Sequence, residues 1–104
     1  MTWLDHHKAS EAAAAAAHDA SRAGQNEEAT RLFASAAIEE VAALEFVRPD
    51  EKPRTFGITA VSAVALYYKA RDFVRAQHLA HSFLTVPSLP AFATDQLREL
   101  LQTI

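Results

Sequence analysis

Glycine and proline occur at only a few points of this chain, and the long stretches between them are rich in helix-forming residues. The 104 residues include two glycines, at positions 24 and 57, and four prolines, at positions 49, 53, 87 and 90. Alanine, leucine, glutamate, glutamine and arginine, which all favour helices, are frequent in the intervening stretches. No stretch shows the sustained apolar–polar alternation that is typical of strands. The spacing of the helix breakers therefore predicts an all-α fold of about five helices.

Several residues mark where these helices should begin and end. Thr2, Asn26 and Asp72 each precede a helical stretch and can cap its first backbone N–H groups. Gly24 can end the first helix in a left-handed conformation, and Pro90 fits the first turn of the last helix. Short loops between successive helices imply antiparallel hairpins. The expected helices form one domain, residues 1–104, and span about 3–23, 26–48, 56–70, 73–85 and 90–103.

The first expected helix contains six consecutive alanines, from Ala12 to Ala17. Small side chains allow two helix axes to approach to the short end of the usual range of about 8–10 Å. The second expected helix has apolar residues at spacings of three and four, including Ala29 and Ala36. We therefore expect these two helices to pack closely, with both alanines buried. Trp3 is expected to attach the first helix to a neighbouring element.

The charge and composition exclude several classes of protein. Ten lysines and arginines stand against 13 acids, so that the formal net charge is −3. This balance argues against nucleic-acid binding, because such proteins usually carry a basic excess. The longest apolar run, the six alanines, is too short to span a bilayer. There is no cysteine, and the first residues do not resemble a signal peptide. We therefore expect a cytoplasmic protein without a nucleic-acid or membrane partner.

A comparison of the chain with itself reveals two related segments. The segment RAGQNEEATRLFASA resembles the tetratricopeptide repeat around the turn between its two helices. In that family a turn glycine is followed by a small residue, an aromatic residue and a second small residue. The corresponding residues here are Gly24, Ala29, Phe33 and Ala36. The segment LYYKARDFVRAQHLAHSFL resembles a second, degenerate copy, in which Arg71 occupies the turn position. The copies lie 47 residues apart, from Gly24 to Arg71, whereas the family's period is 34.

This resemblance implies a right-handed superhelix in which the first helix of each hairpin lines a peptide-binding groove, with the fifth helix as a cap. The groove-facing positions carried over from the family are Glu11, Ala14, His18, Ser21, Arg22, Val61, Ser62, Ala65, Tyr68 and Lys69. Among them, His18, Arg22, Tyr68 and Lys69 are the candidate partner-binding residues. Arg22 and Lys69 would favour an acidic peptide. The function implied is a non-catalytic adaptor, and the alternative is a self-associating helical bundle that forms a homodimer.

No pattern in the sequence indicates an enzyme, a cofactor or a metal site. The motifs for a nucleophilic serine and for phosphate binding are absent. His78 and His81 are three residues apart on one expected helix, but no third ligand is evident. His6 and His7 are adjacent, so on a helix they diverge by about 100° and are not expected to form a site. Tyr68 is expected to fill the core; if it were exposed, it would be a candidate anchor for a partner.

Overall fold

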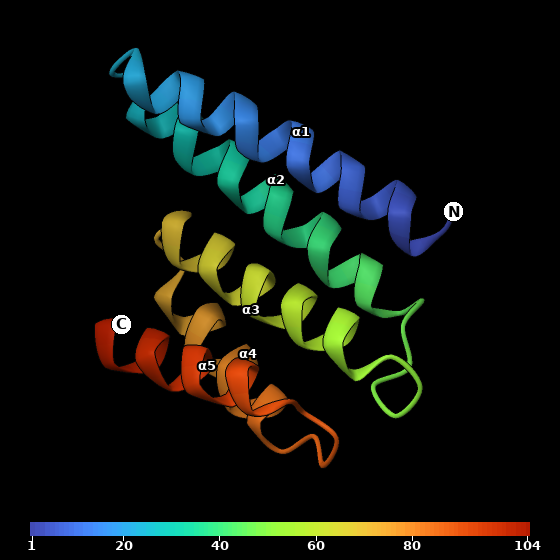
Figure 1. Ribbon diagram of the computed structural model, residues 1–104. Helices are drawn as coiled ribbons and strands as arrows, with labels where there is room; N and C mark the ends of the chain where they lie inside the picture. Colours follow the sequence, from blue (N-terminus) through green and yellow to red (C-terminus); the bar gives the residue numbers. More distant parts are fainter.

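Five α-helices and no strand make up the secondary structure in the computed structural model, which describes residues 1–104 (Figure 1). This confirms the predicted all-α fold, whereas the superhelical twist stays a prediction. The helices are α1 (Trp3–Arg22), α2 (Asn26–Leu44), α3 (Pro53–Lys69), α4 (Phe73–Leu84) and α5 (Ala91–Thr103).

Local side chains explain where two of the helices begin. The Thr2 hydroxyl accepts a hydrogen bond from the Asp5 backbone N–H, and the Asp5 carboxylate accepts one from the Thr2 N–H, which together form a capping box. The Asp72 carboxylate accepts the N–H of Arg75 at the start of α4. The predicted cap at Asn26 is wrong. The turn after α1 is so tight that α2 already begins at this residue, and its side chain makes no cap bond.

The turns that close the two hairpins are alike. Gly24 has a φ of +76° and Arg71 has a φ of +62°, so both adopt the left-handed conformation that ends a helix. After α1, the N–H groups of Gly24 and the following residue donate to the carbonyls of Ser21 and Ala20. The same two bonds occur 47 positions further along, where the N–H groups of Arg71 and Asp72 donate to the carbonyls of Tyr68 and Tyr67. The turn at Arg71 therefore has the same backbone geometry as the turn at Gly24 although it lacks a glycine.

The connection between α2 and α3 differs from the expected boundaries. The second helix ends at Leu44, not near residue 48, and the next residues form tighter turn bonds that lead to Val47. Val47 is buried with Phe56 and Ala60, so packing on α3 bends the chain away from the helical path. The third helix begins at Pro53, three residues before the expected start, because proline suits the first helical position.

The helices form a slab of 41 × 33 × 18 Å, which is about two helices thick. Helix α2 lies between α1 and α3 and packs on both, and α3 also packs on α4 and α5 (Figure 1). Twelve of the eighteen buried hydrophobic residues are alanines, including Ala29 and Ala36 as expected. The indole N–H of Trp3 donates to the Thr59 hydroxyl at 3.1 Å, which attaches α1 to α3 and confirms the expected role of Trp3.

Candidate binding face of helices α1, α3 and α5

Helices α1 and α3 border a hollow of about 230 Å³, which we call the α1/α3 groove. Its floor includes Glu40 of α2, the helix that separates the two walls. The periodicity of the helices explains the lining, because residues three or four apart on α1 and on α3 face the same way. The groove is lined by His7, Ser10, Glu11, Ala14, Glu40, Ser62, Ala65, Leu66 and Lys69.

The Glu40 carboxyl group is the most buried ionisable group of the groove, with 3% of the residue exposed. His7 Nδ1 lies 3.0 Å from one of its oxygens, and the Ser10 hydroxyl lies 3.5 Å from the other. Burial raises the pKa of Glu40 above its usual range, and the hydrogen bond with His7 opposes this shift. The His7 ring is held in place by stacking on Trp3, with 4.7 Å between the ring centroids.

His6 and His7 make two adjacent contacts between α1 and α2. His6 Nδ1 lies 2.8 Å from a carboxylate oxygen of Glu39, and Glu39 directly precedes Glu40, the partner of His7. The expected divergence of the two rings is compatible with this arrangement, because each ring meets a different glutamate. Sequence reasoning missed both pairs. The partners are 33 residues apart in the chain, and only the antiparallel packing of α1 on α2 brings them together.

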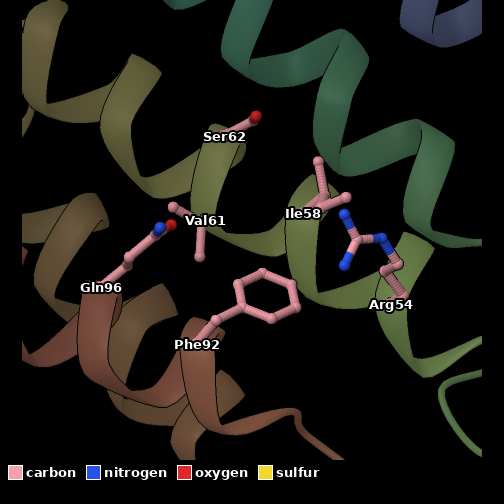
Figure 2. A pocket seen from close by; sticks show the side chains of 6 residues that line it. All are labelled: Arg54, Ile58, Val61, Ser62, Phe92 and Gln96. Carbon is pink, nitrogen blue, oxygen red and sulfur yellow. The ribbon is translucent and has the colours of Figure 1, made fainter.

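Helices α3 and α5 border a second recess, which we call the α3/α5 furrow. It consists of two adjoining hollows of about 470 and 360 Å³ that share Val61 and Gln96. The first hollow is lined by Arg54, Ile58, Val61, Ser62, Phe92 and Gln96 (Figure 2). The second is lined by Val61, Ala65, Gln96, Glu99, Leu100 and Thr103.

The furrow has a charge at each end and an apolar floor between them. The Arg54 guanidinium lies 5.9 Å from the centroid of the Phe92 ring. Figure 2 shows the Phe92 ring extending from α5 toward Ile58, with Arg54 beside Ile58 on α3. Glu99 lines the other end, and neither it nor Arg54 forms an ion pair within the chain. Ser62 lines both the furrow and the α1/α3 groove, so the two recesses lie on one face, the α1/α3/α5 face.

The structure brings together five of the ten predicted groove positions. Glu11, Ala14, Ser62, Ala65 and Lys69 line the α1/α3 groove, and a sixth, Val61, lines the α3/α5 furrow.

The four candidate partner-binding residues have different surroundings. Lys69 lines the groove, with its Nζ 5.8 Å from the centroid of the Phe33 ring. His18 is exposed and packs edge-on against the same ring, at a centroid distance of 5.1 Å. Arg22 pairs with Asp19 on its own helix. Tyr68 is half-buried and packs against Phe73. Of the four, only Lys69 lines a recess of the α1/α3/α5 face.

Two further hollows lie elsewhere, one at the turn between α1 and α2 and one between Trp3 and the α2–α3 connection. His78 and His81 are exposed on α4. Nowhere do three or more histidine, aspartate or glutamate side chains gather in a way that could hold a metal ion. None of the five helices combines the length and the apolar character needed to cross a membrane.

No family model, curated protein or solved structure matches this chain, and its resemblance to the tetratricopeptide repeat stays a prediction from the residues.

Proposed function

We propose that this chain is a non-catalytic protein–protein interaction module that holds a peptide, or a segment of a partner protein, on the α1/α3/α5 face. One observation carries the proposal. Five positions that the repeat pattern assigns to a peptide groove line a single hollow between two helices that are far apart in the sequence. Apolar surface with a few convergent polar groups is typical of binding sites. A cytoplasmic location stays a prediction.

The charges of the groove specify the partner further. Lys69 forms no ion pair within the chain, so its ammonium group is available to a carboxylate of a partner. The charge of Arg22 is already balanced by Asp19. Glu11 and Glu40 line the same groove, so a peptide that is acidic throughout would be repelled. We therefore expect a segment with one acidic side chain near Lys69 and small or apolar side chains beside Ala14 and Ala65.

The proposal can be tested by selecting a phage-displayed library of random peptides on the immobilised chain. We expect enrichment of peptides that contain a single acidic residue. Ala14→Arg places a long side chain in the groove and should weaken binding of the selected peptides at least about tenfold. Ala15→Arg is the matched control, because the neighbouring Ala15 is exposed and lies outside the groove.

The charge of the groove can be tested with a second matched pair. Lys69→Glu should weaken binding of the same peptides, whereas Lys8→Glu, on the exposed part of α1, should not. Circular dichroism should show unchanged helix content in every variant. The proposal is wrong if no peptide is enriched, and its assignment to the α1/α3 groove is wrong if the selected peptides bind the Ala14→Arg and Ala15→Arg variants equally well.

Self-association is the competing explanation, and light scattering distinguishes it. The large exposed hydrophobic residues come from several elements, including Ile38 on α2, Ile58 on α3 and Val74 on α4. Single exposed hydrophobic residues are ordinary on monomeric proteins. We therefore expect a monomer at low micromolar concentration. A stable dimer under these conditions would favour the bundle without a peptide groove.

A further inference from the structure

The α3/α5 furrow has features that the α1/α3 groove lacks, namely two unpaired charges of opposite sign at its ends. No acidic side chain lines the hollow around Arg54, so its guanidinium has no carboxylate to neutralise it there. Phe92 holds the guanidinium by a cation–π contact and leaves its N–H groups free to form hydrogen bonds. At the other end, Glu99 lines a hollow that contains no lysine or arginine.

The middle of the furrow is suited to a backbone and an apolar side chain. Ile58, Val61 and Phe92 provide apolar surface, and Ile58 is 45% exposed, so part of this surface is open to a ligand. The Gln96 amide lines both hollows and lies beside Val61 in Figure 2. A primary amide can donate to a carbonyl and accept from an N–H, so it can pair with a peptide backbone.

The spacing of the two charges limits the ligand. Glu99 lies seven positions after Phe92, which contacts Arg54, so these two positions of α5 are about 10 Å apart along the helix axis. A polyproline II peptide rises about 3.1 Å per residue and returns to the same side every three residues. Side chains three positions apart would therefore lie about 9 Å apart and point to the same side.

We propose that the α3/α5 furrow binds an extended peptide segment in which an acidic and a basic side chain stand three positions apart, with an apolar residue between them. The acidic side chain pairs with Arg54, the basic one with Glu99, and the apolar residue rests on Ile58 and Val61. This inference deepens the proposed function, because it assigns a partner sequence to one recess of the same face. It does not depend on Lys69 or on the α1/α3 groove.

The experiment compares three synthetic peptides that share glycine-serine flanks and carry Glu-Leu-Pro-Lys, Glu-Leu-Pro-Glu or Lys-Leu-Pro-Lys. Binding is measured by NMR titration of the ¹⁵N-labelled full chain, which gives both the affinity and the residues that respond. Exposed ion pairs are worth up to about 1 kcal/mol each, so the first peptide should bind about two- to fivefold more tightly than either of the others. The shifts should fall on α3 and α5.

Charge reversal should change the preferred peptide in a defined way. With Arg54→Glu both ends of the furrow are acidic, so Lys-Leu-Pro-Lys should bind best. With Glu99→Arg both ends are basic, so Glu-Leu-Pro-Glu should bind best. Lys8→Glu is the control for Arg54→Glu, because it changes the net charge equally at a site outside the furrow. It should leave the order of the three peptides as in the unmodified chain.

The inference is overturned if Arg54→Glu and Lys8→Glu rank the three peptides identically, or if no peptide shifts residues of α3 and α5. Its failure can be separated from that of the proposed function. Library peptides that lose binding with Ala14→Arg, while none of the three synthetic peptides contacts the furrow, would leave the α1/α3 groove as the binding site. Failure of both sets would reject the whole face as a peptide-binding surface.

Discussion

Helices α3 and α5 approach each other at Gly57, and replacing this glycine by alanine sets two known effects against each other. Gly57 lies within α3, where glycine costs about 1 kcal/mol relative to alanine, so Gly57→Ala should stabilise the isolated helix. A Cβ at this position, however, would lie 3.1 Å from the Ala93 Cβ and 3.2 Å from atoms of Phe92 and Pro90. These distances are shorter than ordinary van der Waals contacts.

The second effect should be the larger one. The Phe92 ring can rotate away, but Pro90 and the Ala93 Cβ are carried by the backbone, so α5 itself must move. Overpacking of this kind costs about 1–3 kcal/mol. After subtracting the gain in helix propensity, we expect Gly57→Ala to lower the free energy of unfolding by about 1 kcal/mol. For a domain of about 100 residues this corresponds to a decrease in Tm of about 4–8 °C.

Thermal and urea denaturation, followed by circular dichroism, would measure this change, and a double-mutant cycle would identify its origin. Ala93→Gly removes the methyl group that clashes, at its own cost in helix propensity and packing. If the clash is the cause, the double variant Gly57→Ala with Ala93→Gly should be less destabilised than the sum of the single variants. An increase in stability of about 1 kcal/mol for Gly57→Ala alone would refute the reasoning, because helix propensity would then outweigh any close contact.

Two further predictions concern the hairpin turns and the buried carboxyl group. Gly24→Ala should lower the free energy of unfolding by about 1 kcal/mol, because φ is +76° at this position. Arg71→Gly should raise the free energy of unfolding by up to about 1 kcal/mol, because Arg71 also has a positive φ. Urea denaturation measures both changes, and changes of the same sign would contradict the prediction. Burial raises the pKa of Glu40, so the native state binds a proton at this carboxyl group more tightly than the unfolded chain does. The protonated carboxyl group therefore favours the native state at low pH, and this contribution to stability is lost as the pH rises above the usual pKa of a glutamate. Glu40→Gln should therefore become more stable relative to the unmodified chain as the pH rises above about 4, the usual range of a glutamate, and a difference that is independent of pH would exclude this linkage.

The Arg71 turn has a bearing on how the two hairpins are related. The residues around it depart from the repeat pattern, yet the helix-ending bonds are the same as those around Gly24. A non-glycine residue in the left-handed conformation costs roughly 1–2 kcal/mol, so the surrounding packing must hold it there. Tyr67 in the last turn of α3 and Ala70, which follows this helix, are both buried and supply that packing.

Local signals in the sequence were sufficient to predict most of the fold. The positions of glycine and proline predicted five helices, and Thr2 and Asp72 cap two of them as expected. The small residues Ala29 and Ala36 are buried. Such features depend on propensities and on hydrogen bonds between residues a few positions apart, so they can be read without knowledge of the tertiary contacts. The end of α2 at Leu44 could not be predicted, because the packing of Val47 on Phe56 determines the path of the chain after this helix.

The recesses of the α1/α3/α5 face were decided mainly by tertiary structure. The repeat pattern placed Lys69 and Ala14 on one groove, but no spacing along the chain relates His7 to Glu40 or Arg54 to Phe92. These pairs come from different helices, and their proximity depends on how closely the helix axes approach. Gly57 and the buried alanines set that distance through side-chain volume, which acts only once the helices are packed together.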